Sequence, residues 1–440
     1  MQNHSSLKAT SPLGEWLCYL ENSHFKAIDL GLERVKSVAQ ALDLLRPAPF
    51  VITVGGTNGK GTTCRLLETI LLNAGYRVGV YSSPHLICYN ERVRIQNQEL
   101  PDAAHSASFA FIDANKTQSL TYFEFSTLSA LYLFKQAQLD VVILEVGLGG
   151  RLDATNIVDS DLAVITSIDI DHTDFLGSTR EQIAFEKAGI FRAHKMAIIG
   201  EPDVPQSLLD YAAQIDCPLS LHGQGWQFAT QTHSWHWQGK KLNLRDLPLP
   251  QIPLANAATA LATVEQLPFE ISQQVIRDAL QQVQLNGRFQ AINTPEQLQT
   301  LAHKTEKLLE KLPHFIVDVG HNPHAARYLA QRLQQLKAQL GGNVIAVCGI
   351  LQDKDAQGIL QPLFGIIEQW HFVTLSGPRG QTGEHLRQTL LQAQPNLNAQ
   401  SADSVVAGVQ QAVQVAESRD VLIVFGSFHT VGEFWQWLQN

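Results

Sequence analysis

A glycine-rich turn at residues 55–61 contains the side chains whose spacing most clearly suggests chemistry. An apolar, β-branched run precedes the turn and is typical of a buried parallel strand, and apolar residues recur at helical spacing after Lys60. Such an arrangement can bind a phosphate chain, because backbone N–H groups at glycines and at a helix N-terminus approach the oxygens while the lysine adds a mobile charge. Thr62 or Thr63 could place a hydroxyl on a magnesium ion.

The strict P-loop pattern is not met in this turn. Val54 stands where the pattern has its first glycine, and Gly61 stands where it has Ser or Thr after the lysine. The alternative interpretation is a glycine-rich turn that joins a strand to a helix and binds no ligand. We favour a nucleotide loop, because a clear strand pattern enters the turn and a clear helix pattern leaves it.

Polar residues at the ends of three further predicted strands are candidates for a metal site. Ser83 follows a short apolar strand, Glu145 ends a longer apolar run, and His172 follows the next strand along the chain. Ligands in open α/β sheets collect at the carboxyl ends of the strands, so these side chains are expected near the glycine-rich turn. A carboxylate at the end of a buried strand also requires a partner, which can be a cation.

Each of these candidates has an ordinary alternative. The Ser-Ser-Pro turn at Ser83 can be only a turn, and Glu145 can pair with Arg151 in place of a metal. His172 is the weakest of the three on chemical grounds, since magnesium prefers oxygen ligands to imidazole. Lys187 lies in a stretch with helical spacing, and the bare sequence favours a lysine on the surface of that helix.

Composition limits the possible classes of protein. The 440 residues suffice for two or three domains, and a hydrophobic content of 45% is normal for a soluble globular chain. The formal net charge of −9 argues against a nucleic-acid partner, and the five scattered cysteines form no Cys-x-x-Cys pair that would indicate a zinc knuckle. Because no signal pattern and no apolar run of ~18 residues is present, we expect a cytoplasmic protein with no membrane partner.

The alternation of predicted strands and helices indicates an α/β protein with two domains. We expect an N-terminal P-loop-type ATPase domain with a mostly parallel sheet at residues 1–290. A polar segment at residues 291–313 is expected to be a linker with some helix. The α/β rhythm restarts at residues 314–440, which predicts a smaller, Rossmann-like domain without a nucleotide loop of its own.

Local patterns predict further elements inside these domains. Alternation around Trp235, together with Trp226 and Trp237, predicts a small antiparallel sheet. Asn256 and Asn322 each precede a run with helical spacing, and we expect both to be helix N-caps.

Motifs spread along the whole chain match one family in order and spacing. They occupy residues 28–35, 56–62, 82–86, 121–124, 145–156, 171–173, 186–190, 256–260, 287–289, 318–323 and 426–430. On these motifs the chain resembles the bacterial bifunctional dihydrofolate synthase/folylpolyglutamate synthase family, the folate members of the Mur ligase superfamily. Many members carry Ser where Thr62 stands, and Asp-Gly-Ala-His-Asn-Pro is common at residues 318–323; this chain keeps the hydroxyl and the polar residues.

The resemblance implies roles for matching residues in catalysis and in binding ATP and metal. The implied nucleotide contacts are Asn58, Gly59, Lys60, Gly61, Thr62, Asn256, Arg288 and Asp318. The implied magnesium ligands are Ser83, Glu145 and His172. Lys187 would be carbamylated and would support a second magnesium ion, so the implied catalytic residues are Lys60, His172 and Lys187.

The resemblance also implies where the other substrates bind. Residues implied to border the pterin are Ile28, Asp29, Leu30, Thr121, Tyr122, Phe123, Glu124, Leu152, Asp153 and Ala154. The C-terminal domain would hold the incoming glutamate, with His321 and Ser427 as candidates.

The reaction implied by the resemblance is an ATP-dependent ligation, carried out by a monomer. The carboxylate of dihydropteroate, or of the glutamate tail of a reduced folate, would attack the γ-phosphate of ATP and form an acyl phosphate. The amine of L-glutamate would then attack the acyl carbon, while domain closure excludes water.

Three alternatives to this function are a folylpolyglutamate synthase without the first activity, a Mur-type ligase acting on a cell-wall precursor, and a P-loop switch that is not an enzyme. The motif at residues 121–124 and the N-terminal match argue against the cell-wall ligase. A second α/β domain with polar strand ends argues against the switch, which does not need one.

Overall fold

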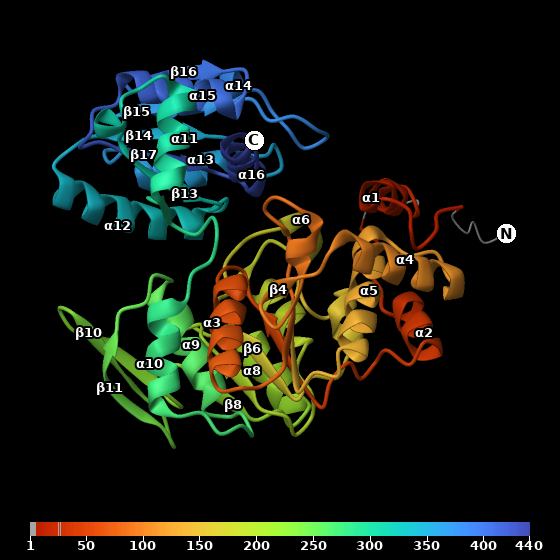
Figure 1. Ribbon diagram of the computed structural model, residues 1–440. Helices are drawn as coiled ribbons and strands as arrows, with labels where there is room; N and C mark the ends of the chain where they lie inside the picture. The colour runs from red at the N-terminus through yellow and green to blue at the C-terminus, as the bar shows by residue number, and fades with distance from the viewer. Residues whose placement is uncertain (1–5, 25, 27) are drawn as a thin grey trace. The chain divides into compact units, whose positions relative to one another are not determined.

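The computed structural model describes residues 6–24, 26 and 28–440, which form two units. Unit 1 contains the described residues up to His85 together with Tyr89–Gln284, and unit 2 contains Leu86–Cys88 and Leu285–Asn440 (Figure 1). Each unit is an α/β structure built on its own sheet, as the strand and helix patterns predict. In the described part of the chain, no helix is both long and apolar enough to cross a membrane.

An eight-stranded sheet forms the centre of unit 1, in the order β4-β3-β2-β5-β1-β6-β7-β8 within the described residues. The pairs from β2 to β8 are parallel, whereas β3 and β4 add an antiparallel edge. The strands are β1 Phe50–Gly55, β2 Val78–Tyr81, β3 Val93–Ile95, β4 Gln98–Glu99, β5 Val141–Glu145, β6 Leu162–Ile165, β7 Ala197–Ile199 and β8 Leu219–Leu221. The mostly parallel sheet is therefore confirmed.

Helices cover both faces of this sheet, which explains why its central strands read as continuous apolar runs. Successive strand side chains point to opposite faces, so Ile52 packs in the same core as α3, α9 and α10, while Val51 packs with α1, α2 and α5. The helices of unit 1 are α1 Leu13–Glu21, α2 Glu33–Ala41, α3 Lys60–Asn73, α4 Asp102–Asn115, α5 Tyr122–Gln136, α6 Thr173–Leu176, α7 Arg180–Ala188, α8 Gln206–Gln214, α9 Leu254–Val264 and α10 Gln273–Gln282, with short 3-10 turns η1 Tyr89–Arg92 and η2 Ala154–Ile157.

The predicted antiparallel excursion is present as a separate three-stranded sheet in unit 1. It consists of β9 Gln227–Thr230, β10 Ser234–Gln238 and β11 Asn243–Pro248, with β10 in the middle. Trp235 and Trp237 are fully buried and join the core that contains α3 and α9, so alternate residues of β10 attach this sheet to the unit.

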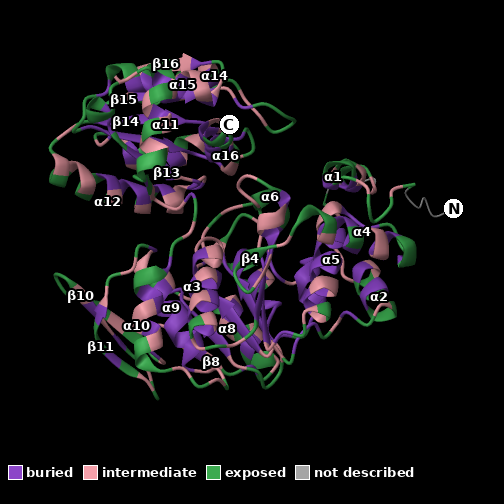
Figure 2. Cartoon of the chain, viewed as in Figure 1, coloured by how far each residue is buried: buried purple, intermediate pink, exposed green. Residues whose placement is uncertain are grey.

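Unit 2 contains a six-stranded sheet in the order β12-β13-β17-β14-β15-β16. All its pairs are parallel except that of β12 with β13. Its strands are β12 Gln290–Ile292, β13 His314–Asp318, β14 Val344–Cys348, β15 Gln369–Val373, β16 Asn398–Ala402 and β17 Val421–Phe425. Its helices are α11 Pro295–Thr305, α12 Pro323–Leu340, α13 Ala356–Leu360, α14 Gly383–Ala393, α15 Val405–Val415 and α16 Phe428–Gln439, with turns η3 Leu309–Lys311 and η4 Gln361–Leu363. Figure 2 shows buried strands inside both units and exposed residues on the outward faces of helices.

The division of the chain differs from the boundaries expected from sequence. Residues 285–290 belong to unit 2, because the Phe289 N–H donates to Asp318 and the Val319 N–H donates to the carbonyl of Gly287. Residues 291–313 hold the end of β12, all of α11 and η3, so this segment is an integral part of unit 2. Its polar composition reflects exposed positions on α11, which the sequence pattern alone did not distinguish from a linker.

Candidate active site

The glycine-rich turn lies between β1 and the first residue of α3, Lys60, as predicted. Gly56 and Gly59 have φ angles of 145° and 85°, a left-handed region that other residues rarely adopt. A Cβ atom at Gly56 would collide with the hydroxyl of Thr166, and one at Gly59 would collide with the side-chain amide of Asn256. Both glycines are therefore required by backbone conformation and by close neighbours.

The segment after β6 holds the turn in one conformation. The Thr57 N–H donates to the carbonyl of Ser167 at 2.8 Å, and the Thr57 hydroxyl donates to the carbonyl of Asp169 at 3.0 Å. The Asn58 N–H donates to the Ser167 hydroxyl at 3.0 Å, and the Thr166 hydroxyl donates to the Asn58 carbonyl at 2.6 Å. These bonds preorganise the loop, which lowers the entropic cost of binding an anion there.

Lys60 and Thr62 lie on the turn itself. The Lys60 ammonium donates to the carbonyls of Gly56 and Thr57 at 3.0 and 3.3 Å, so the charge lies over the loop. The Thr62 hydroxyl donates to the Gly59 carbonyl at 2.9 Å and accepts a 2.7 Å bond from the Asn256 amide. Thr63 is fully buried and Thr62 is only 3% exposed, so burial does not choose between the two predicted hydroxyls.

Asn256 corrects one prediction, because it is not the N-cap of its helix. Helix α9 begins at Leu254 after Pro253, so Asn256 lies inside the first turn. Its side chain turns away from its own helix and contacts Gly59 and Thr62. By contrast, the predicted N-cap Asn322 is confirmed, because its side chain accepts the Ala325 N–H at 2.9 Å.

The carboxyl ends of the central strands bring the metal candidates to the same edge of the sheet. In the register of β1 and β5, Val54 pairs with Glu145, which places this carboxylate beside the start of the glycine-rich turn. Ser83 follows β2, the other neighbour of β5. His172 follows β6; its side chain is 37% exposed, and its Nε2 lies 4.0 Å from Asp171 Oδ1.

The surroundings of Glu145 distinguish between the two interpretations of this residue. Glu145 is 6% exposed, so its charge is largely withdrawn from water. The expected partner Arg151 instead donates from Nε and Nη2 to one oxygen of Glu186, at 3.1 and 2.7 Å, so Arg151 is engaged with Glu186. Within the described ranges, no three His, Cys, Asp or Glu side chains gather into a metal cluster.

Lys187 is buried on α7, which overturns the expectation of a surface lysine. The residue is 3% exposed, and its amine makes no hydrogen bond or ion pair with the part of the chain that the structure describes. Burial lowers the pKa of its amine to about 7, and the charge of Lys60 acts in the same direction. Periodicity predicted the helix correctly but could not show that residues from neighbouring elements cover this face.

Two family models match most of the chain: the Mur ligase middle domain over residues 54–246, and the Mur ligase, glutamate ligase domain over residues 305–428. A dihydrofolate synthase/folylpolyglutamate synthase from Haemophilus influenzae is 66% identical over 98% of this chain and 99% of that protein. The protein of the same name from Escherichia coli is 52% identical over 96% of this chain and 95% of its own length. The chain belongs to the dihydrofolate synthase/folylpolyglutamate synthase family of Mur ligases.

Solved structures of this family share the fold. A structure of Escherichia coli FolC in complex with DHPP and ADP has 51% identity and a TM-score of 0.91, covering 99% of each chain. A Yersinia pestis folylpolyglutamate synthase/dihydrofolate synthase complexed with AMPPNP and Mn ion has 54% identity and a TM-score of 0.90, over 99% of this chain and 100% of that one. As a member of this family, the chain is an ATP-dependent ligase of folate metabolism.

Several family residues expected at the pterin form one network in unit 1. Arg34, which sequence reasoning passed over, donates to Asp29 at 2.8 Å and to Glu124 at 2.7 Å. The other oxygen of Glu124 accepts the Thr121 N–H in a capping box at the start of α5. Ile28 and Leu30 flank Asp29 and are 45% and 41% exposed, which leaves two apolar side chains free to cover a ligand. No spacing rule links Arg34 to Glu124, since the two residues are 90 positions apart in the sequence.

Asp153 and Phe123 both lie close to Gly147, in the loop after β5. The Asp153 carboxylate accepts the N–H groups of Gly147 and Leu148 at 3.0 and 2.8 Å. Burial raises the pKa of this carboxyl, although these hydrogen bonds oppose the shift. The ring of Phe123 lies so close to Gly147 that a Cβ there would overlap it. Asp153 therefore orders the loop, while Tyr122 and Phe123 supply aromatic surface at the start of α5.

The family residues expected in unit 2 gather at the ends of β13 and β17, which are neighbours. Asp318 accepts the N–H groups of Phe289 and Gly320, each at 2.7 Å; burial raises the pKa of its carboxyl, and the charge of Arg288 opposes that shift. The Arg288 guanidinium lies 5.2 Å from the centre of the Phe428 ring. His321 Nδ1 lies 2.9 Å from the Val319 carbonyl oxygen.

Ser427 has a clear local role at the N-terminus of α16. Its hydroxyl accepts the Thr430 N–H at 3.0 Å and shares a 2.7 Å hydrogen bond with the Thr430 hydroxyl. The residue is 2% exposed. A capping hydroxyl this buried has little capacity left for a ligand, so the structure favours a positioning role for Ser427 over a direct glutamate contact.

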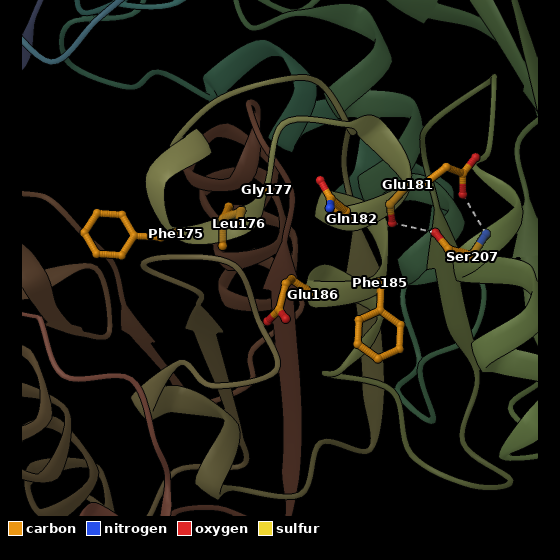
Figure 3. A pocket seen from close by; sticks show the side chains of 8 residues that line it. All are labelled: Phe175, Leu176, Gly177, Glu181, Gln182, Phe185, Glu186 and Ser207. Atoms are coloured by element: carbon orange, nitrogen blue, oxygen red, sulfur yellow. Dashed lines mark hydrogen bonds between the residues drawn. The ribbon is translucent and has the colours of Figure 1, made fainter.

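A cavity of about 520 Å³ lies on unit 1, and its lining residues are distant in the sequence from the glycine-rich turn (Figure 3). It is lined by residues of α6, α7 and the start of α8: Phe175, Leu176, Gly177, Glu181, Gln182, Phe185, Glu186 and Ser207. Glu181 accepts hydrogen bonds from Ser207, and Glu186 is paired with Arg151. None of the residues predicted for the site lines this cavity, and its carboxylates already have partners within the protein.

Proposed function

We propose that this chain catalyses both ATP-dependent glutamate additions named in its family: L-glutamate to dihydropteroate, and L-glutamate to the tail of reduced folates. The observation that carries the proposal is the preorganised loop with Lys60. It lies at the carboxyl edge of the sheet, where the neighbouring strand β5 ends at Glu145. The Haemophilus influenzae and Escherichia coli relatives bear both activities in their names. We also propose that the enzyme acts as a cytoplasmic monomer.

ATP fits the loop as its phosphate-binding substrate. The backbone of residues 56–59, the N-terminus of α3 and the Lys60 ammonium supply positive potential to the phosphates. A carboxylate oxygen of the pterin substrate attacks the γ-phosphorus, and the bond from that phosphorus to the ADP oxygen breaks. Because this transition state spreads negative charge over phosphoryl oxygens, Lys60 contributes mainly by position and charge. We also propose nucleotide-binding roles for Arg288 and Asp318, which belong to unit 2.

A divalent cation fits the donor set of Ser83, Glu145 and His172. Glu145 is a buried carboxylate beside the loop, and carboxylate and hydroxyl oxygens are the ligands that magnesium prefers. When bound, the ion would neutralise charge on the phosphates and orient them. The relatives from Yersinia pestis carry Mn with AMPPNP, which supports a divalent-metal requirement in this chain as well.

Carbamylation of Lys187 is supported by its burial and its chemistry. With a pKa of about 7, much of the amine is neutral at physiological pH. The neutral nitrogen can attack the carbon of CO₂ and lose a proton, which leaves a carbamate anion. The product places an anion near Lys60 in place of the amine, and it adds oxygen donors suited to a second magnesium ion.

The second half of the reaction requires glutamate at the acyl phosphate. The amine of L-glutamate attacks the acyl carbon, the bond from carbon to the phosphate oxygen breaks, and the amine loses a proton as the amide forms. We propose that unit 2 holds the glutamate near His321, with Ser427 acting through the N-terminus of α16. The pterin would lie on the surface formed by Tyr122, Phe123 and the exposed Leu30.

The acyl phosphate can be tested by isotope transfer. Dihydropteroate labelled with heavy oxygen in its carboxylate is incubated with the purified chain, MgATP and L-glutamate. The mechanism transfers one labelled oxygen to inorganic phosphate, which mass spectrometry detects. Amide formation without label in phosphate would contradict an acyl phosphate, and label without added glutamate would indicate hydrolysis of the intermediate by water.

A further inference from the structure

A fully buried carboxylate on α3 has no assigned role in the reaction. Glu68 is 0% exposed and accepts hydrogen bonds from two arginines: Arg65 Nη1 at 2.9 Å and Arg94 Nη2 at 3.0 Å. Arg94 Nε lies 3.3 Å from each oxygen of the same carboxylate. Burying an ion pair costs desolvation energy, and a protein with apolar residues in its place is often equally stable. We therefore ask which segments this pair holds in place.

Arg94 extends this pair to the segment that carries a proposed metal ligand. Its Nη1 donates to the Ser82 hydroxyl and to the Glu91 carbonyl, both at 3.2 Å. The Ser82 N–H also donates to the carbonyl of Arg92 at 2.9 Å, so both the backbone and the side chain of Ser82 are fixed. Ser83 comes next and precedes Pro84, which restricts the backbone of Ser83 to extended conformations.

Arg94 is also within the electrostatic range of Glu145. Burial lowers the pKa of the Arg94 guanidinium, but the charge and hydrogen bonds of Glu68, with smaller contributions from Cys64 and Glu145, leave that pKa above its usual value. One guanidinium thus joins α3, which begins at the phosphate loop, to Ser82 and lies in the field of Glu145. All these residues belong to unit 1.

We propose that Arg94, held by Glu68, is a positioning residue for the divalent-metal site. It fixes the Ser82–Ser83 turn relative to α3, so that the Ser83 hydroxyl and the loop phosphates present their oxygens to one ion. The inference rests on the proposed function, because it requires Ser83 and Glu145 to be metal ligands. Groups that orient metal ligands typically affect metal affinity by about 10- to 100-fold when they are replaced.

The test measures Mn²⁺ binding in the presence of AMPPNP, from the loss of the spectroscopic signal of free Mn²⁺. Arg94→Lys keeps the charge but loses the fork that reaches both Glu68 and Ser82, and we expect about tenfold weaker Mn²⁺ binding. Ser82→Ala removes only the hydroxyl that Arg94 holds, leaves no unpaired charge, and should weaken Mn²⁺ binding several-fold with little change in thermal unfolding.

Arg77→Met is the matched control. Arg77 forms a bidentate pair with Asp140 on the same sheet, at the opposite end of β2, and should leave Mn²⁺ binding unchanged. Unchanged binding in folded Arg94→Lys and Ser82→Ala would overturn the positioning role, as would a loss of thermal stability in Arg94→Lys without a change in Mn²⁺ affinity. If Arg94→Lys does not fold, Ser82→Ala decides. Unchanged binding in Glu145→Gln as well would show that the proposed metal site itself has failed.

Discussion

Burial decides what the amine of Lys187 can do. At its ordinary pKa a lysine beside a phosphate site would be a cation, whereas burial brings the pKa of Lys187 to about 7. The same environment that makes the charged amine costly makes the neutral amine available to CO₂. Burial of Lys187 should therefore affect both the free energy of unfolding and the reactivity of the amine, and each can be measured separately.

The stability effect has a defined sign. Between the folded pKa of about 7 and the ordinary value of 10.5, the unfolded chain binds a proton at Lys187 that the folded chain does not. In CO₂-free buffer, the free energy of unfolding unit 1 should therefore rise with pH across this window, by up to about 1.4 kcal/mol per pH unit. Lys187→Met should lack this contribution. Parallel pH profiles for the two proteins in urea unfolding would contradict a depressed pKa.

The chemical effect is tested by rescue. Lys187→Ala should be nearly inactive, because it removes the amine that we propose to be carbamylated. Added bicarbonate or a small carboxylate should restore part of the activity by entering the space left by the side chain, whereas chloride at equal ionic strength should not. Mass spectrometry under CO₂-preserving conditions should find the extra carboxyl group in the wild-type chain. A fully active Lys187→Ala enzyme would leave the buried lysine with a structural role only.

Glu145 carries the second residue-level prediction. Glu145→Gln keeps the size of the side chain and removes its charge, so the magnesium concentration for half-maximal activity should rise at least tenfold. Glu270→Gln, at an exposed position of the same unit, is the control and should titrate like the wild type. If magnesium titrations of Glu145→Gln and the control coincide, Glu145 is not a metal ligand.

At the residue scale, strand and helix periodicity correctly predicted where Gly59, Lys60 and Glu145 lie in the fold: the first two where β1 leads into α3, and the third at the end of β5. Their roles in binding remain predictions. Arg34 and the burial of Lys187 could not be predicted this way, since both depend on residues from distant segments.

At the scale of elements, the turn between β1 and α3 depends on the shape of its glycines. Gly59→Ala should place a Cβ against Asn256 and force a left-handed alanine, which costs about 1–2 kcal/mol before the collision is counted. We expect the AMPPNP affinity measured by calorimetry to fall more than tenfold. Gly75→Ala is the matched control: Gly75 has a similar φ of 89°, but nothing lies within 4 Å of the added Cβ. Equal nucleotide affinities in the two variants would show that the collision is unimportant.

Most helices and strands were predictable because their two faces differ in polarity. The spacing of apolar residues and the lengths of the apolar runs predict both α/β sheets and the small antiparallel sheet. The failures share one cause. Residues 291–313 are polar because α11 has exposed positions, yet β12 pairs with β13 through backbone bonds that composition does not show. Asn256 is a residue type that often caps helices, but its side-chain amide donates to Thr62, which is distant in the sequence.

At the scale of the whole molecule, the chain contains two α/β units, and each carries part of the predicted site. The nucleotide loop, the metal candidates and Lys187 belong to unit 1, whereas Arg288, Asp318 and His321 belong to unit 2. The two family models match one in each unit: the middle-domain model lies almost entirely in unit 1 and the glutamate ligase model in unit 2.

The central claim is that ATP cleavage by this chain forms an amide to glutamate. The most direct measurement follows ADP and the pterin product together, with dihydropteroate or tetrahydrofolate as acceptor and a UDP-sugar acid as control. We predict one ADP per glutamate added to either folate acceptor, none with the UDP-sugar acid, and at least about a 10³-fold loss in folded Lys60→Ala, equivalent to about 4 kcal/mol of activation free energy. ADP release that does not depend on L-glutamate, or the absence of an amide product with both folate acceptors, would contradict the account.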